Sequence, residues 1–215
     1  MLSAGEAQAV VAALNGANET HGRIYFFDTD TLDLLSEGVI IRLREGTRSD
    51  LTVKLRPPEG RGFVSSSVKN DDFKCEVHLT GNKSNLSYSM TSRFAAEQFP
   101  QTGSEVARLL GPAQMQLLTD AQVSVDWTRV KRISEIRSTV WRTQSQPHLG
   151  KLALELWEWP GGAILELSTK VSPGSGPSAF TELQRLVKKK RLVPNAQQRP
   201  KTAIALEAIE DAAQH

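Results

Sequence analysis

Basic side chains alternate along two neighbouring segments of the chain, in a spacing that suits the binding of a strongly anionic group. Arg42 and Arg44 are separated by one residue, and so are Lys54 and Arg56. Side chains of a β-strand point alternately to its two faces, so each pair lies on one face of its strand. If the strands are neighbours, four cationic groups face the same side. Guanidinium groups can hold phosphate oxygens in a bidentate manner, which makes phosphate the expected anion.

Carboxylates occupy similar strand positions in three other segments. Glu76 lies in FKCEVHL, Glu155 in LALELWEW and Glu166 in AILELSTK. Carboxylates can hold a hard divalent cation such as Mg²⁺, which in turn bridges phosphates. Two interpretations remain open at this point. The charges line the interior of a closed barrel and act on a triphosphate, or they are solvated on the polar face of an open sheet.

The elements that carry these residues follow the order helix, strands, helices, strands, helix. Strands are predicted over 23–27, 39–44, 51–56, 73–79, 130–142, 151–159 and 163–171. Helices are predicted over 7–14, 91–99, 105–118 and 179–190, with one helical turn over 31–36. Residues 60–70 are predicted to form a mobile loop. This order predicts an α+β chain with about seven antiparallel strands, forming a single domain over residues 1–215.

Composition excludes several classes of protein. The chain has 26 Lys and Arg against 24 Asp and Glu, a net charge of +2, which is too balanced for a protein that coats nucleic acid. Cys75 is the only cysteine, so a disulfide framework is excluded, and the four His are too scattered for a zinc site. No segment has the length and apolarity of a membrane span. We expect a cytoplasmic protein that binds neither nucleic acid nor membrane.

The order of these motifs resembles a known family. YFFDTDTLDLLSEGVIIRLRE followed by LTVKLR resembles the opening of the CYTH, or triphosphate tunnel metalloenzyme, family. ILELSTK and RPKTAIAL resemble later motifs of the same family, so the resemblance spans nearly the whole chain. It implies an eight-stranded antiparallel tunnel with flanking helices. It also implies hydrolysis of a triphosphate, such as inorganic triphosphate, thiamine triphosphate or a nucleotide, with Mg²⁺ or Mn²⁺.

The resemblance also implies roles for individual residues. The phosphate ligands would be Arg42, Arg44, Lys54, Arg137 and Lys201, with Arg56 assisting because it shares the face of Lys54. The carboxylates around the metal would be Glu76, Glu155 and Glu166. No residue is assigned as a catalytic base.

The chain departs from the family pattern in its acidic residues. The family's E-x-E-x-K strand is not found before MLSAGEAQAVVAAL, and Ile164 replaces a carboxylate on the ILELSTK strand. Fewer carboxylates predict weaker Mg²⁺ binding, and a barrel without this strand is expected to be open. The alternatives are therefore a triphosphate phosphohydrolase, a non-catalytic module of the same fold that binds polyphosphate or a phosphorylated metabolite, and an unrelated open sheet. The last alternative predicts that Arg42 and Arg44 are fully exposed.

Overall fold

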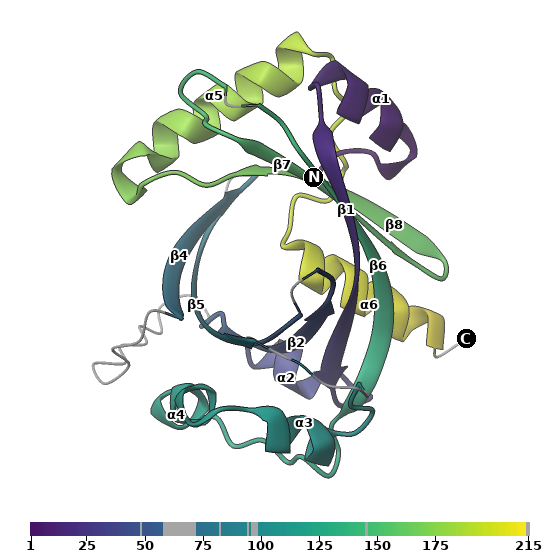
Figure 1. Cartoon of the computed structure of the whole chain (residues 1–215), viewed down its shortest axis with the longest axis vertical. Helices are drawn as coiled ribbons and strands as arrows, with labels where there is room; N and C mark the ends of the chain where they lie inside the picture. Colours follow the sequence, from purple (N-terminus) through teal and green to yellow (C-terminus); the bar gives the residue numbers. More distant parts are fainter. Residues whose placement is uncertain are drawn as a thin grey trace. The chain divides into compact units, whose positions relative to one another are not determined.

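A computed structural model describes residues 1–47, 49–57, 72–81, 83–93, 95, 99–144 and 146–213 (Figure 1). The helices are η1 (Ala4–Glu6), α1 (Ala7–Ala13), α2 (Asp33–Ser36), α3 (Gly103–Leu109), α4 (Pro112–Asp120), η2 (Pro173–Ser175), α5 (Gly176–Lys189) and α6 (Lys201–Ala213). The strands are β1 (Ala17–Asp28), β2 (Val39–Glu45), β3 (Asp50–Leu55), β4 (Phe73–Thr80), β5 (Lys83–Arg93), β6 (Lys131–Arg142), β7 (Leu152–Trp159) and β8 (Gly162–Thr169).

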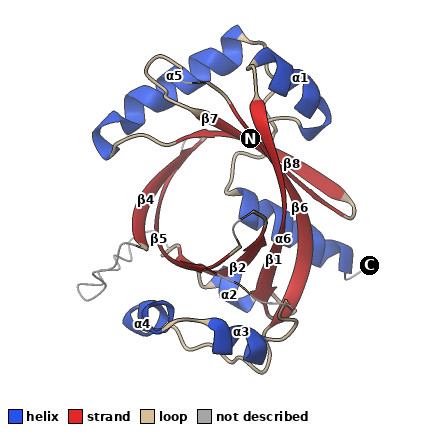
Figure 2. Ribbon diagram, viewed as in Figure 1, coloured by secondary structure: helices blue, strands red, loops and turns tan. Residues whose placement is uncertain are grey.

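The eight strands form one sheet with the order β4-β5-β3-β2-β1-β6-β7-β8. The pairings β1 with β2, β2 with β3, β3 with β5, β6 with β7 and β7 with β8 are all antiparallel. The predicted α+β class, with an antiparallel sheet and flanking helices, is confirmed (Figure 2). The order is linear, with β4 and β8 at its ends, as an open form of the predicted barrel requires.

The contacts within the chain divide it into two compact units. Unit 1 comprises residues 1–22, 79–83 and 136–209, and unit 2 comprises residues 23–78, 84–135 and 210–215. Each unit is described by itself below. The single domain that we expected over residues 1–215 stays a prediction.

The core of unit 2 lies between one face of its strands and the helices α3 and α4. Alternate residues of β2, namely Val39, Ile41 and Leu43, are almost fully buried on this face. Val106 of α3 and Leu117 of α4 pack into the same cluster. The period of two in the sequence therefore buries one face of β2 and leaves its other face to Ile40, Arg42 and Arg44.

The core of unit 1 is built in the same way, with helices on one face of its strands. Leu154 of β7 and Leu165 of β8 are fully buried against Val10 of α1. Leu186 of α5 packs against the same cluster, and Figure 1 shows α1 and α5 together on this side of β7. The first residue of α6 contacts side chains on the opposite face of β7 and β8, and these contacts form part of the site described below.

Some predicted elements differ from the structure. Residues 91–93 belong to strand β5 and not to the helix predicted over 91–99; residues 94 and 96–98 of that helix lie outside the described residues. Strand β5, KSNLSYSMTSR, was not predicted because its polar residues conceal the alternation of Tyr88 and Met90. The helix predicted over 105–118 is interrupted at Gly111–Pro112, since proline lacks the N–H that continues a helix. The loop predicted over 60–70 lies outside the described residues.

The turn between β1 and β2 depends on a buried carboxylate. Oδ1 of Asp28 accepts hydrogen bonds from the backbone N–H groups of Thr29 and Leu34, at 2.7 and 2.9 Å. Its Oδ2 accepts from the N–H of Leu35 at 2.9 Å. Burial raises the pKa of Asp28, and these three hydrogen bonds oppose that rise. The carboxylate thus fixes α2 and the direction in which the chain enters β2.

Among the described residues, no helix combines the length and the apolar composition that crossing a membrane requires.

Candidate functional site

The predicted cationic face is present in unit 2, on the side of the strands opposite the core cluster that α3 and α4 cover. In the strand register Arg42 lies opposite Thr52, and Ile40 lies opposite Lys54. Residues opposite one another in paired strands lie on the same face, so Arg42 and Lys54 share a face. Arg44 and Arg56 belong to it by alternation. We call Arg42, Arg44, Lys54 and Arg56 the cationic face.

These basic side chains are largely covered, and the buried residues Ile24, Phe26 and Ile40 lie on the same face as Arg42 and Arg44. The side chain of Arg42 is 24% exposed and that of Lys54 is 17% exposed. A fully solvated polar face, as an unrelated open sheet would have, predicts exposed guanidinium groups. Nη2 of Arg42 donates to Thr52 Oγ1 at 3.3 Å and lies 3.5 Å from a carboxylate oxygen of Asp50.

Arg44 has a donor that its surroundings leave unsatisfied. Its Nε is buried and has no hydrogen-bond partner among the residues that the structure describes. A buried N–H without an acceptor costs free energy of about 1–3 kcal/mol, and such groups are uncommon in folded proteins. An anion that accepted from this N–H would remove the cost. This donor is therefore available to a ligand that offers an acceptor.

Lys54 lies among three polar side chains from β4 and β5. Its Nζ is 3.1 Å from Nε2 of His78 and 4.0 Å from a carboxylate oxygen of Glu76. Nε2 of His78 is also 2.9 Å from Oγ of Ser87, which is buried. The structure thus brings the predicted Glu76 beside Lys54. Sequence reasoning missed His78 and Ser87; the alternation of β4, which places Glu76 and His78 on one face, was the available signal for His78.

The other predicted carboxylates form a cluster in unit 1. Glu155 of β7 and Glu166 of β8 lie directly opposite each other in the strand register. The ammonium group of Lys201, the first residue of α6, is hydrogen-bonded to Oε2 of Glu155 and lies 2.6 Å from Oε2 of Glu166. It also lies 4.5 Å from the ring centroid of Trp157. We call Lys201 and its three partners the ammonium cluster.

The remaining oxygen of Glu155 is held as well. Its Oε1 accepts from Nε1 of Trp157 at 2.8 Å and from Oγ of Ser138 at 3.2 Å. These two donors fix the carboxylate so that Oε2 is directed to Lys201. Trp157 therefore contributes twice, through its N–H to Glu155 and through its ring face to Lys201. Neither Trp157 nor Ser138 was predicted as a site residue.

Arg137 is not brought to the ammonium cluster. It lies opposite Glu158 in the pairing of β6 with β7, whereas Glu155 lies opposite Val140. Odd and even positions of a strand point to opposite faces, so Arg137 and Glu155 lie on opposite faces of these strands. Arg137 is exposed. Its predicted role as a phosphate ligand stays a prediction, and within unit 1 it is separated from Lys201.

The residues present fit an ammonium group better than a resident divalent metal. Within the part of the chain that the structure describes, no group of three or more His, Cys, Asp or Glu is placed to hold a metal ion. Mg²⁺ takes six oxygen ligands in octahedral geometry, of which one or two carboxylates and several water molecules are the usual set, and in the ammonium cluster the Trp157 ring fills a direction that such waters would need. An aromatic face attracts an ammonium group but is not a ligand for a hard dication. The expected Mg²⁺ or Mn²⁺ stays a prediction.

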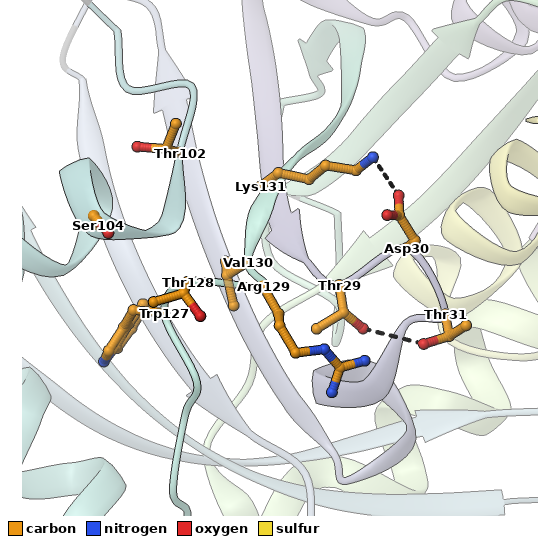
Figure 3. A pocket seen from close by; sticks show the side chains of 10 residues that line it. All are labelled: Thr29, Asp30, Thr31, Thr102, Ser104, Trp127, Thr128, Arg129, Val130 and Lys131. Carbon is orange, nitrogen blue, oxygen red and sulfur yellow. Dashed lines mark hydrogen bonds and ion pairs between the residues drawn. The ribbon is translucent and has the colours of Figure 1, made fainter.

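A separate hollow of about 610 Å³ lies in unit 2, at the ends of β1 and β6 (Figure 3). Thr29, Thr31, Trp127 and several other polar residues line it, together with two cations. Both cations have acidic partners: Lys131 pairs with Asp30, and Arg129 lies 2.9 Å from a carboxylate oxygen of Asp33. Unlike Arg44 on the cationic face, none of the described residues that line this hollow has a buried donor without a hydrogen-bond partner, so the hollow shows no comparable sign of an anion site.

Comparisons with known proteins identify the fold. No family model matches the chain, and no curated protein matches it. Among solved structures, the chain is similar to a candidate adenylyl cyclase from Hippeastrum with a dominant triphosphatase activity, at 15% identity and a TM-score of 0.62, covering 94% of this chain and 90% of that one. A candidate adenylate cyclase from Bacillus halodurans matches at 15% identity and a TM-score of 0.60, covering 92% and 91%.

A protein from Pyrococcus horikoshii matches at 13% identity and a TM-score of 0.51, covering 96% of each chain. At these identities the similarity is one of fold. The CYTH-like fold that the motifs predicted is therefore confirmed: the chain has the fold of these cyclase-type and triphosphatase structures.

Proposed function

We propose that the protein is a triphosphate phosphohydrolase whose cationic face binds the phosphate chain of its substrate. The observation that carries this proposal is the buried, unsatisfied Nε of Arg44 within a row of covered basic side chains. Protein groups on this face satisfy only part of its donor capacity, and a phosphate chain offers many acceptors along one line. Inorganic triphosphate, thiamine triphosphate and nucleoside triphosphates all share that chain.

In this proposal three residues of the cationic face have defined tasks. Arg42 and Arg44 hold phosphate oxygens through their planar guanidinium groups, and Lys54 supplies a compact positive charge. Water attacks the terminal phosphorus, the bond from that phosphorus to the bridging oxygen breaks, and the bridging oxygen leaves with the shortened chain. Fixed positive charges stabilise the charge that develops on the leaving oxygen and on the transferred group.

A divalent cation enters this proposal as the counter-ion that a triphosphate carries in solution. Such an ion neutralises phosphate oxygens when it is bound. We assign no step to a resident metal, because the ammonium cluster does not provide a suitable set of ligands. Two carboxylates of unit 2 border the proposed phosphate position: Asp50 lies 3.5 Å from Arg42, and Glu76 lies 4.0 Å from Lys54.

Hydrolysis is supported by the fold shared with the Hippeastrum protein, which has a dominant triphosphatase activity. A specific observation favours a second candidate, a binding module without turnover. Two of the three carboxylates expected around a metal are engaged by Lys201. A protein that kept the phosphate ligands but lost the metal would bind triphosphates without cleaving them.

The test is phosphate release from inorganic triphosphate, thiamine triphosphate and ATP, each with Mg²⁺ or Mn²⁺. Binding of the same compounds is measured in parallel by calorimetry. The variant Arg44→Ala removes the unsatisfied donor, and Arg108→Ala is the matched control, because Arg108 is an exposed arginine of α3 in the same unit. We expect Arg44→Ala to weaken binding and turnover by about tenfold or more and Arg108→Ala to change neither.

Binding that depends on Arg44 without any turnover would select the binding module. Turnover that is equal in Arg44→Ala and in the wild type would place the chemistry away from the cationic face. Absence of both binding and turnover for all three compounds would contradict the proposal.

A further inference from the structure

We propose that Lys201 is the resident cation of the Glu155–Glu166 pair, so that Lys201 and a divalent metal ion exclude each other from this position. The proposal concerns cation binding in unit 1 and does not depend on the proposed triphosphate hydrolysis. It follows from four properties of the ammonium cluster: the facing carboxylates, the completeness of the ammonium contacts, the fixed orientation of Glu155 and the place of Lys201 in α6.

The facing carboxylates require a cation between them. Glu155 and Glu166 are direct cross-strand partners, and like charges in that position destabilise a sheet. Both side chains are covered, at 17% and 26% exposed, so water screens their repulsion only in part. A positive charge that contacts both carboxylates converts this repulsion into attraction. Lys201 is placed to do so.

The ammonium group of Lys201 has a partner for each of its three N–H donors. Two are the carboxylates of Glu155 and Glu166, and the third direction is filled by the ring of Trp157. The side chain is 13% exposed. Three donors that meet two anions and an aromatic face form a complete environment for an ammonium ion. A hard dication in the same place would find two carboxylates and lose its remaining water ligands against the ring.

Two hydrogen bonds within the protein fix the orientation of the Glu155 carboxylate. Nε1 of Trp157 and Oγ of Ser138 donate hydrogen bonds to its Oε1, while its Oε2 contacts Lys201. The Oε2 atom is therefore the oxygen that a cation meets. Removal of the Lys201 ammonium would leave the preoriented oxygen of Glu155 beside Glu166, on which only the more general field of the N-terminal ammonium group of Met1 then acts. The excess of negative charge would attract a divalent ion from solution.

Lys201 is also the residue at which α6 begins. A positive side chain at a helix N-terminus is unfavourable, because the helix dipole places partial positive charge there. The carboxylates of Glu155 and Glu166 compensate both the side chain and the helix end. Entry of a metal would require Lys201 to leave, and the start of α6 would then lose its attachment to β7 and β8. Metal binding at this position is thus opposed by the docking of the helix.

The experiment is a titration with Mn²⁺ alone, without any phosphate compound, in which electron paramagnetic resonance measures the free ion. Wild type, Lys201→Met and Lys201→Arg are compared. Lys190→Met is the matched control, because Lys190 is an exposed lysine of the same unit. We expect Lys201→Met to bind Mn²⁺ at least about tenfold more tightly than wild type, since the charge of the position changes by one unit. Lys201→Arg and Lys190→Met are expected to match wild type.

Two further variants test whether Mn²⁺ binds at Glu166, and one of them leaves Lys201 in place, so that a misfolded Lys201→Met variant cannot decide the result. The tighter binding of Lys201→Met is expected to disappear in Lys201→Met combined with Glu166→Gln. In the otherwise wild-type chain, Glu166→Gln is expected to leave Mn²⁺ affinity unchanged, because Mn²⁺ does not reach Glu166. If Glu166→Gln weakens Mn²⁺ binding in that chain, a metal occupies the position despite Lys201 and the proposal is overturned. A folded Lys201→Met variant that gains no affinity would overturn it equally.

Discussion

The ammonium group of Lys54 lies 3.1 Å from Nε2 of His78. A lysine ammonium group can only donate hydrogen bonds, so this contact requires Nε2 to accept, and we predict that His78 is neutral with its proton on Nδ1 although Nε2 also lies 3.8 Å from a carboxylate oxygen of Glu76. Ser87 places its hydroxyl 2.9 Å from the same Nε2. His78 therefore orients the lysine charge on the cationic face. The one signal for this role in the sequence was the alternation of β4, which places His78 on the face of Glu76.

We predict that His78→Phe weakens triphosphate binding by about three- to tenfold, because Lys54 loses an acceptor that orients its charge. His78→Gln is expected to lose less, since its amide oxygen can accept in place of Nε2. Calorimetry measures the affinities, and ¹⁵N resonances of the imidazole ring test the tautomer independently of any ligand. A protonated Nε2 in the free protein, or an unchanged affinity in His78→Phe, would contradict the positioning role.

We predict that Arg44→Met leaves the free energy of unfolding unchanged or raises it by up to about 1 kcal/mol, while triphosphate binding weakens by about tenfold or more. The unsatisfied Nε of Arg44 costs free energy in the unliganded protein, and an apolar side chain of similar length has no such donor. Chemical denaturation in phosphate-free buffer measures the first quantity. A loss of stability comparable to the removal of a buried ion pair would show that Arg44 is a structural residue.

We predict that Gly38→Ala destabilises the protein by at least about 2 kcal/mol, because a side chain is strained at positive φ and would also meet the backbone. Gly38 has φ +78°, and an added Cβ would lie 2.1 Å from the carbonyl oxygen of Arg56. The oxygen of Gly38 accepts from the N–H of Arg56 at 2.7 Å, so this turn positions a residue of the cationic face.

Gly161→Ala is the matched control for this turn. Gly161 has φ +87°, but an added Cβ meets nothing within 4 Å. Its substitution therefore tests positive φ without the clash, and we expect a cost of about 1 kcal/mol by the same denaturation experiment. Equal losses of unfolding free energy in the two variants would show that the contact with the Arg56 carbonyl oxygen does not add to the destabilisation.

We predict a distinctive pH dependence for Asp28. Burial raises its pKa in the folded protein, so between the ordinary and the raised value the folded state binds more protons than the unfolded state. The contribution of Asp28 to stability is therefore greatest below its ordinary pKa and falls as the pH rises through the raised value. Denaturation of wild type and Asp28→Asn across the weakly acidic range isolates this contribution.

The difference in unfolding free energy, wild type minus Asp28→Asn, should decrease with rising pH and then become constant. A difference that increases over this range would mean that the three backbone hydrogen bonds to Asp28 outweigh its burial.

Much of the fold could be predicted because its signals are local. A period of two placed Arg42 and Arg44 on one face of β2, and the same rule placed Lys54 and Arg56 on one face after the turn. Strand β5 was missed because its serines and asparagine hide that period. The break between α3 and α4 was missed although Pro112 marks it, because the flanking residues are good helix formers.

The sequence by itself determined the alternation of charged and apolar residues and the antiparallel α+β class. It also carried the resemblance from which roles for the candidate residues were inferred. Only the tertiary structure decided which of these residues meet. Glu155 and Glu166 lie 46 and 35 positions from Lys201, and the register between strands separates Arg137 from them although all four were expected at one site. The physical reason is that alternation is a property of one strand, whereas register and helix docking depend on contacts between segments far apart in the chain.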